Sequence, residues 1–182
     1  RAAGPGRRPS RRRRQALRRF LILAFGRARD ILGGPDCAAW FRAHYGLDPV
    51  ATLRRVTPTL VLRSYPGRTG SQPGERTVQV GSYQFGERVI ALSHPMVLTA
   101  VDSDDADFWL DYVAGVIVHE VAHYVDEVGD GVNDDGGFKP PLEEGEEAQR
   151  ACSCLHVLSG QQIDRLYTAS HEPGRALAQP SR

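Results

Sequence analysis

His119-Glu120-Val121-Ala122-His123 lies inside the longest apolar stretch of the chain, from about Phe108 to Val128. Residues i and i+4 of an α-helix share one face, so both imidazoles can reach the same metal ion. Glu120 lies beside that face, where its carboxylate can take a proton from a zinc-bound water. The H-E-x-x-H pattern therefore predicts a buried helix that binds Zn²⁺ through its two histidines, with Glu120 as the general base.

A catalytic zinc needs a third protein ligand and one open position. Residues 124–130 contain no histidine, so a third imidazole does not follow the motif closely. The next acidic groups on a predicted helix are Glu143, Glu144, Glu146 and Glu147. The third ligand is therefore expected from this group, although some of these carboxylates simply favour the positive end of a helix.

The apolar positions that follow distinguish these acids. If the helix continues to Gly160, the steps i+4, i+7, i+8 and i+11 from Glu147 are all apolar: Ala151, Cys154, Leu155 and Leu158. The same steps from Glu144 are also apolar, but Glu144 lies in a first turn that can fray. Glu146 leads to Arg150 and is expected to face outward. We predict Glu147 as the third ligand, with Glu144 as the alternative.

The two segments together resemble the small gluzincin-type metallopeptidases, and the ImmA/IrrE-like group most closely. In that group an H-E-x-x-H helix is followed by a Glu-Ala-Asn-x-x-Ala helix, and here Glu147-Ala148-Gln149 follows the motif. The likeness covers about residues 75–160 and departs at Gln149, which replaces the Asn, and after Leu158, where the helix-ending Pro motif is missing. It implies a zincin-like fold whose edge strand holds an extended peptide above the zinc, and hydrolysis of peptide bonds.

Periodicity predicts an α+β fold. Helices are expected over residues 15–32, 37–45, 108–128, 140–160 and 162–167, and strands over 56–63, 77–83 and 88–93. The last two strands form a hairpin around Gln84-Phe85-Gly86-Glu87. We expect a small, mostly antiparallel sheet packed on the H-E-x-x-H helix and on the Glu-bearing helix that follows.

Charge divides the chain into three regions. Residues 1–30 carry 11 Arg and one acid, whereas the remainder carries 12 basic and 21 acidic side chains. We predict a basic, partly disordered extension with an amphipathic helix over 1–34, a metallopeptidase domain over 35–170 and a flexible tail over 171–182. Three interpretations of the basic segment stay open: a solvated arm (disordered over 1–14), weak contact with nucleic acid or an anionic membrane, and contact with the acidic body.

The three cysteines, Cys37, Cys152 and Cys154, cannot all pair with one another. We therefore predict no disulfide framework and a reducing, cytoplasmic location. The apolar run Phe20–Phe25, which follows Arg11–Arg14, has only six residues. It is too short for a signal peptide or a membrane span.

The pattern does not determine which groups orient the histidines or which groups stabilise an oxyanion. Acids near the motif that can orient a histidine are Asp111, Asp126 and Glu127, and candidates for stabilising an oxyanion are Tyr83, His94, Tyr124, Arg150 and His156. Two functions compete with a peptidase that acts on polypeptides. One is a non-catalytic zinc-binding interaction module, and the other is a nucleic-acid-binding or anionic-surface-binding protein that uses the Arg-rich segment.

Overall fold

The central element is α5 (Ala106–Gly129), which carries the H-E-x-x-H motif. The computed structural model describes residues 10–56, 61–65, 68–69, 76–84, 87, 89–129 and 141–171. Asp105 starts α5, because its Oδ1 accepts the N–H of Phe108 at 3.3 Å. Side chains on several sides of the helix are fully buried, namely Val113, Ala114, Ile117, Val118, Val121, Ala122 and Val125. The predicted apolar helix is therefore confirmed, and it must be covered on all sides.

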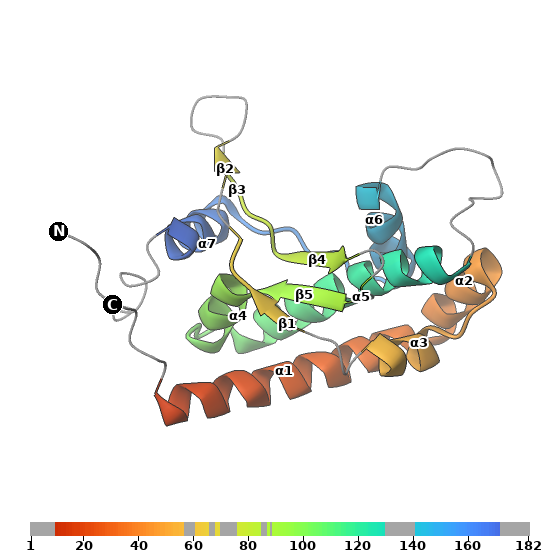
Figure 1. Cartoon of the computed structure of the whole chain (residues 1–182), viewed down its shortest axis with the longest axis horizontal. Helices are drawn as coiled ribbons and strands as arrows, with labels where there is room; N and C mark the ends of the chain where they lie inside the picture. The colour runs from red at the N-terminus through yellow and green to blue at the C-terminus, as the bar shows by residue number, and fades with distance from the viewer. Residues whose placement is uncertain are drawn as a thin grey trace.

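The long helix α1 (Arg11–Leu32) covers one side of α5. Figure 1 shows it along the lower side of the molecule, with α5 and the sheet above it. Its buried residues belong to the same core as those of α5: Leu17, Ala24, Ala28 and Leu32. Ser10 caps the first turn by accepting the N–H of Arg13. Residues 11–14 are therefore helical, and the prediction that they are disordered was wrong. Within the described residues, none of the helices has the length and apolarity that a bilayer-spanning segment needs.

Two short helices complete this side of the molecule. Helix α2 (Pro35–Tyr45) confirms the second predicted helix. Helix α3 (Pro49–Val56) was not predicted. Asp48 caps it, since its Oδ1 accepts the N–H of Ala51 at 2.9 Å. The Asp-Pro pair was the available signal, because Asp favours the N-cap and Pro the first helical turn.

The sheet has three strands in the order β1 (Val61–Arg63), β5 (Val89–Ser93) and β4 (Gly81–Gln84). Strands β4 and β5 are antiparallel, with Ser82 opposite Ala91, which confirms the predicted pairing. Strand β1 is parallel to β5, so this sheet is mixed and not mostly antiparallel. The strand does not form a hairpin with β4, the next strand of this sheet along the chain. It pairs with β5 as a parallel neighbour, and a parallel pair needs a crossover connection instead of a hairpin.

A second pair of strands lies beyond this sheet. Strands β2 (Arg68–Thr69) and β3 (Arg76–Thr77) are antiparallel. The strand predicted over 56–63 is shorter in the structure, because α3 ends at Val56 and β1 begins at Val61. Strand β4 is an edge of the three-stranded sheet within the described residues and packs against α5.

Two further helices flank the sheet. Helix α4 (His94–Val101) follows β5 directly and was not predicted, although Ser93 caps it and Pro95 lies in its first turn. Helix α7 (Gly160–His171) extends the short helix that was predicted there. It begins with a capping box, since the Oγ of Ser159 accepts the N–H of Gln162 and the side chain of Gln162 accepts the N–H of Ser159.

Helix α6 (Pro141–Ala151) is shorter than the predicted 140–160. Ser153 has a positive φ of 54°. The N–H of Cys154 donates to the carbonyl of Gln149, and that of Ser153 to the carbonyl of Arg150. This is a Schellman motif, with Ser at the left-handed position that glycine usually occupies. The apolar positions from Cys154 onward therefore do not continue the helix, so the stripe that favoured Glu147 does not exist.

Cys37 of α2 and Cys152, which follows α6, form a disulfide, whereas Cys154 is free and buried. The prediction of no disulfide framework did not allow for this single bond. Three cysteines exclude complete pairing but permit one bond, and only the packing of α2 on α6 brings these two together. Disulfides persist mainly in oxidising compartments, so the predicted cytoplasmic location loses its main support.

We expect Cys37→Ser/Cys152→Ser to lower the free energy of unfolding by about 2–5 kcal/mol. The bond joins positions that are 115 residues apart, so its loss restores much chain entropy to the unfolded state. Urea denaturation followed by circular dichroism measures the change. Reductant should destabilise the wild type and leave the double variant unaffected. Equal midpoints for the two proteins without reductant would show that the bond does not form.

Candidate metal centre

The two histidines of the motif lie side by side on α5. The ring centroids of His119 and His123 are 4.8 Å apart, and the ring planes meet at 76°. His123 is buried and His119 is half-buried. One helical turn separates them, as expected for a pair that shares a face. Both imidazoles therefore lie next to each other on one side of the helix.

Burial also determines the protonation of these rings. It lowers the pKa of His119, and it lowers the pKa of His123 to about 4, with a further decrease from the charge of His119. A group whose pKa falls on burial loses its proton more readily in the folded protein. At neutral pH both imidazoles are neutral, which is the form that binds a metal ion.

Glu120 is buried where β4 begins, with 5% of its surface exposed. A Cβ at Gly81 would lie 2.6 Å from Oε1 of Glu120 and 2.7 Å from Cγ1 of Val116, so only glycine permits this approach. Burial raises the pKa of Glu120 to about 8, and a hydrogen bond from the backbone of Tyr83 opposes the shift. A nearby cation would lower this pKa again, because it favours the carboxylate.

Helix α6 contacts His119 through a glycine and a glutamine. A Cβ at Gly145 would overlap the imidazole ring of His119. One turn later, Nε2 of Gln149 donates to the carbonyl of Gly115 at 2.9 Å, and its Oε1 lies 3.4 Å from Nδ1 of His119. An N–H at Nδ1 donates to this oxygen, which leaves Nε2 of His119 with its lone pair.

The predicted third ligand, Glu147, does not lie on this face. It is two residues beyond Gly145, which places it about 200° around the helix axis. No group of three His, Cys, Asp or Glu that could hold a metal occurs among the described residues. The side chain of Glu144 lies outside the described part of the chain. The structure therefore brings together His119, His123 and Glu120, but not Glu147.

Glu146 is nearer the site than its sequence position suggested. It lies in the wall of the same groove as His119, and its charge raises the pKa of His119, although burial outweighs this effect. It also forms an ion pair with Arg150, at 2.7 Å. The prediction that Glu146 faces outward was therefore only partly right.

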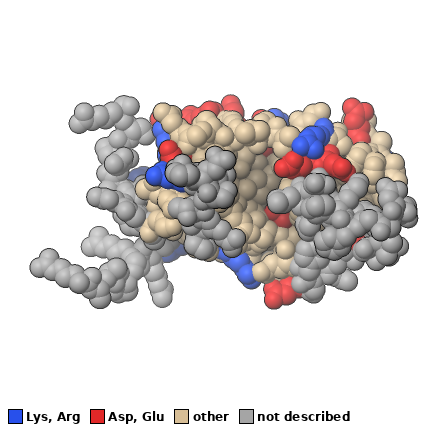
Figure 2. Space-filling view, turned by 90° about the horizontal axis from the view of Figure 1, so that it is seen from above, with Lys and Arg blue, Asp and Glu red and all other residues tan. Residues whose placement is uncertain are grey.

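The site opens into a groove of about 480 Å³. One wall is the chain from Arg76 to Gly81, the floor includes His119 and Glu120, and the opposite wall is the segment 155–158. Most of the lining is apolar, and Val157 is 81% exposed. Figure 2 shows this face from above, with a hollowed strip of mostly uncharged residues near its middle. Such a groove suits an extended chain with apolar side chains.

Of the five proposed oxyanion groups, only His156 lies in the described lining of this groove. Tyr83 and Tyr124 pack edge to face in the core, and Arg150 pairs with Glu146. Among the second-shell candidates, Asp111 pairs with Arg27 at 2.7 Å instead of orienting a histidine. The side chain of Glu127 lies outside the described residues.

Three residues of the site were not predicted from the sequence: Gly81, Gly145 and Gln149. A glycine inside a strand or a helix pattern signals a close approach of another group, and both glycines carried that signal. Gln149 was noted only as a departure from the family pattern. Its role depends on α6 lying across α5, which no sequence pattern indicates.

No protein-family model, curated protein sequence or solved structure shows significant similarity to this chain. Functional inference therefore depends on the geometry of the site.

Gly145→Ala tests the contact between α6 and His119. In a helix with free space around the glycine, replacing Gly by Ala raises the free energy of unfolding by up to about 1 kcal/mol, because Gly loses more backbone entropy on folding than Ala does. Here we expect a loss of about 1–3 kcal/mol in the free energy of unfolding, since the methyl group would overlap the ring. Gly160→Ala is the matched control, because nothing lies within 4 Å of a Cβ at that position. Equal effects in urea denaturation would contradict the contact.

Proposed function

We propose that this chain is a zinc-dependent peptidase in which His119 and His123 hold the metal and Glu120 is the general base. The observation that supports this most strongly is the arrangement of these side chains on α5. Two neutral imidazoles share one face, and a buried carboxyl group next to them lines a groove wide enough for a polypeptide. A purely structural zinc site would need no such carboxyl group.

The donor set fits zinc in part. Two imidazole nitrogens are ligands that zinc prefers, and Gln149 orients one of the rings. The third ligand would be an acid of α6. Glu147 was the prediction from sequence, with Glu144 as its alternative. Among the described residues neither Glu146 nor Glu147 forms a metal-holding group with the two histidines, so Glu144 is the ligand that this proposal favours. When bound, zinc would polarise the scissile carbonyl and promote ionisation of a water molecule.

The protein's own residues account for the movement of protons. Glu120 is placed to accept a proton from the attacking water and to deliver it to the scissile nitrogen as the C–N bond breaks, so that the leaving group is a neutral amine. Its burial excludes bulk water from this transfer. Gly81 allows β4 to pass directly over the carboxyl group, so the substrate-binding strand and the base are kept in register.

The substrate in this proposal is an extended polypeptide. Strand β4 is an edge strand of the described sheet, and the segment from Arg76 leads into it along the groove. A peptide can add to such an edge through main-chain hydrogen bonds, and its side chains then meet the opposite wall. Leu155 and Val157 are exposed apolar residues of that wall, so we infer a preference for apolar side chains there.

One observation favours a second function, a zinc-binding interaction module without catalysis. The residue of α6 that touches His119 is Gly145, which has no side chain to offer as a ligand. A site with only two protein ligands would bind zinc weakly and would depend on a partner for the rest of its coordination. The same groove would then bind a polypeptide without cleaving it.

Glu120→Gln distinguishes the two functions. The change keeps the shape of the side chain, so we expect zinc to remain bound while peptide hydrolysis falls at least about 100-fold. Metal content by mass spectrometry and cleavage of a quenched fluorescent peptide, without reductant, measure both properties. A wild-type protein that binds zinc and peptide but never cleaves the peptide would favour the interaction module.

A parallel set of variants identifies the third ligand: Glu144→Ala, Glu146→Ala and Glu147→Ala. We expect Glu144→Ala to weaken zinc binding about tenfold or more, since loss of a ligand weakens binding more than loss of a contact that only orients a ligand. Glu147→Ala should bind zinc as the wild type does. Loss of metal only in Glu147→Ala would show that α6 turns on metal binding and would restore the sequence-based assignment.

A further inference from the structure

The outward face of α1 exposes two large apolar side chains next to each other. Ile22 is 61% exposed and Leu23 is 59% exposed. The opposite side of the same helix is already buried against α5. These two residues therefore do not serve the core of this chain, and their exposure to water is unfavourable.

An apolar groove of about 740 Å³ lies beside this pair, between α1, α3 and β1. Its apolar lining consists of Leu17, Leu21, Ile22, Phe25, Leu53 and Leu62. The charged residues of the lining are all arginines: Arg14, Arg18, Arg29 and Arg54. The described lining of the groove is thus mostly apolar, and its charged residues are all positive, with no acidic residue among them.

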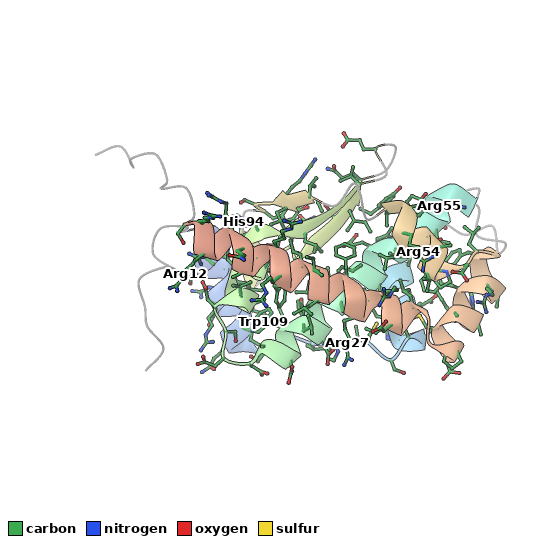
Figure 3. All side chains as sticks on the ribbon, turned by 90° about the horizontal axis from the view of Figure 1, so that it is seen from below. Arg12, Arg27, Arg54, Arg55, His94 and Trp109 are labelled. Atoms are coloured by element: carbon green, nitrogen blue, oxygen red, sulfur yellow. A yellow bond between two sulfur atoms is a disulfide. The ribbon has the colours of Figure 1, made fainter. Side chains whose placement is uncertain are left out.

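Other arginines of α1 are used within the fold. Arg13 pairs with Asp102, and Arg27 pairs with Asp111. In contrast, the four arginines Arg18, Arg19, Arg54 and Arg55 form no ion pair with any described residue. Figure 3 shows α1 across the face seen from below, with Arg54 and Arg55 of α3 alongside it. This face therefore has positive charge that the described fold does not neutralise.

We propose that the face formed by α1 and α3 docks on a bilayer that contains anionic phospholipids. Ile22 and Leu23 would enter the boundary between head groups and acyl chains, and the surrounding arginines would contact the phosphates. Exposed aliphatic side chains inside an arginine surround are what an interfacial helix needs. Nucleic acid would use the arginines but gains nothing from Ile22 and Leu23, which are the exposed large apolar side chains described on α1 and have no ring for stacking on bases.

Docking in this orientation leaves the peptide-binding groove accessible. That groove lies on the face seen from above in Figure 2, whereas α1 crosses the face seen from below in Figure 3. The membrane-binding surface and the candidate metal centre are therefore separate. Each can be removed without changing the other, and the inference does not depend on the proposed peptidase activity.

Co-sedimentation of the full chain with vesicles tests the proposal. Vesicles of phosphatidylcholine alone are compared with vesicles that also contain phosphatidylserine. We expect binding only to the anionic vesicles, with affinity that falls as salt is added. Arg18→Gln/Arg19→Gln should weaken binding about 25-fold, which is about fivefold for each arginine near an anionic surface. Ile22→Ser/Leu23→Ser should weaken it at least about tenfold, because less apolar surface enters the bilayer.

Arg165→Gln is the control, because it removes one positive charge from α7, outside the groove. It should bind vesicles within about twofold of the wild type, by the same estimate of charge effects near the surface. Circular dichroism checks that each variant is folded. Equal binding to neutral vesicles, or no binding to either kind, overturns the proposal. The proposal is also overturned if only the arginine variant loses binding and the protein binds heparin or DNA as tightly as it binds anionic vesicles. That result would identify a general polyanion surface.

Discussion

The structure depends on a helix that is buried on nearly every side and yet carries polar side chains. Helix α5 can cross the centre of the fold because its other residues are small or apolar and pack against α1, the sheet and α6. His119, Glu120 and His123 must then be accommodated by those neighbours. Two glycines make this possible, since Gly81 and Gly145 let β4 and α6 approach the buried polar groups.

Burial of Glu120 has an electrostatic consequence. Transfer of a carboxylate away from water is unfavourable, and the raised pKa of Glu120 is the result. The histidines respond to the same environment in the opposite direction and become neutral. The site is therefore poor in charge, and a divalent cation is the kind of ligand that would stabilise the carboxylate and use both imidazole lone pairs.

Helix α6 is held in position from two sides. Gln149 binds the carbonyl of Gly115 in α5, and the disulfide from Cys152 to Cys37 joins the end of the helix to α2. The carbonyl of Cys154 also approaches α5, since a Cβ at Gly115 would lie 2.5 Å from it. The orientation of α6 decides which of its side chains face the histidines, and so whether the proposed metal site would have a third protein ligand.

The sequence by itself determined the long apolar helix, the neighbouring imidazoles on one of its faces and the antiparallel pair β4–β5. These features depend on local periodicity, because residues four apart in a helix must meet wherever the helix lies. Only the tertiary structure decided the parallel strand β1, the Cys37–Cys152 bond and the face of α6 that packs against α5. Each of these joins segments distant in the chain, and their relative placement follows from how the core packs. The end of α6 was missed for a local reason, because Ser153 adopts the left-handed conformation that usually requires glycine.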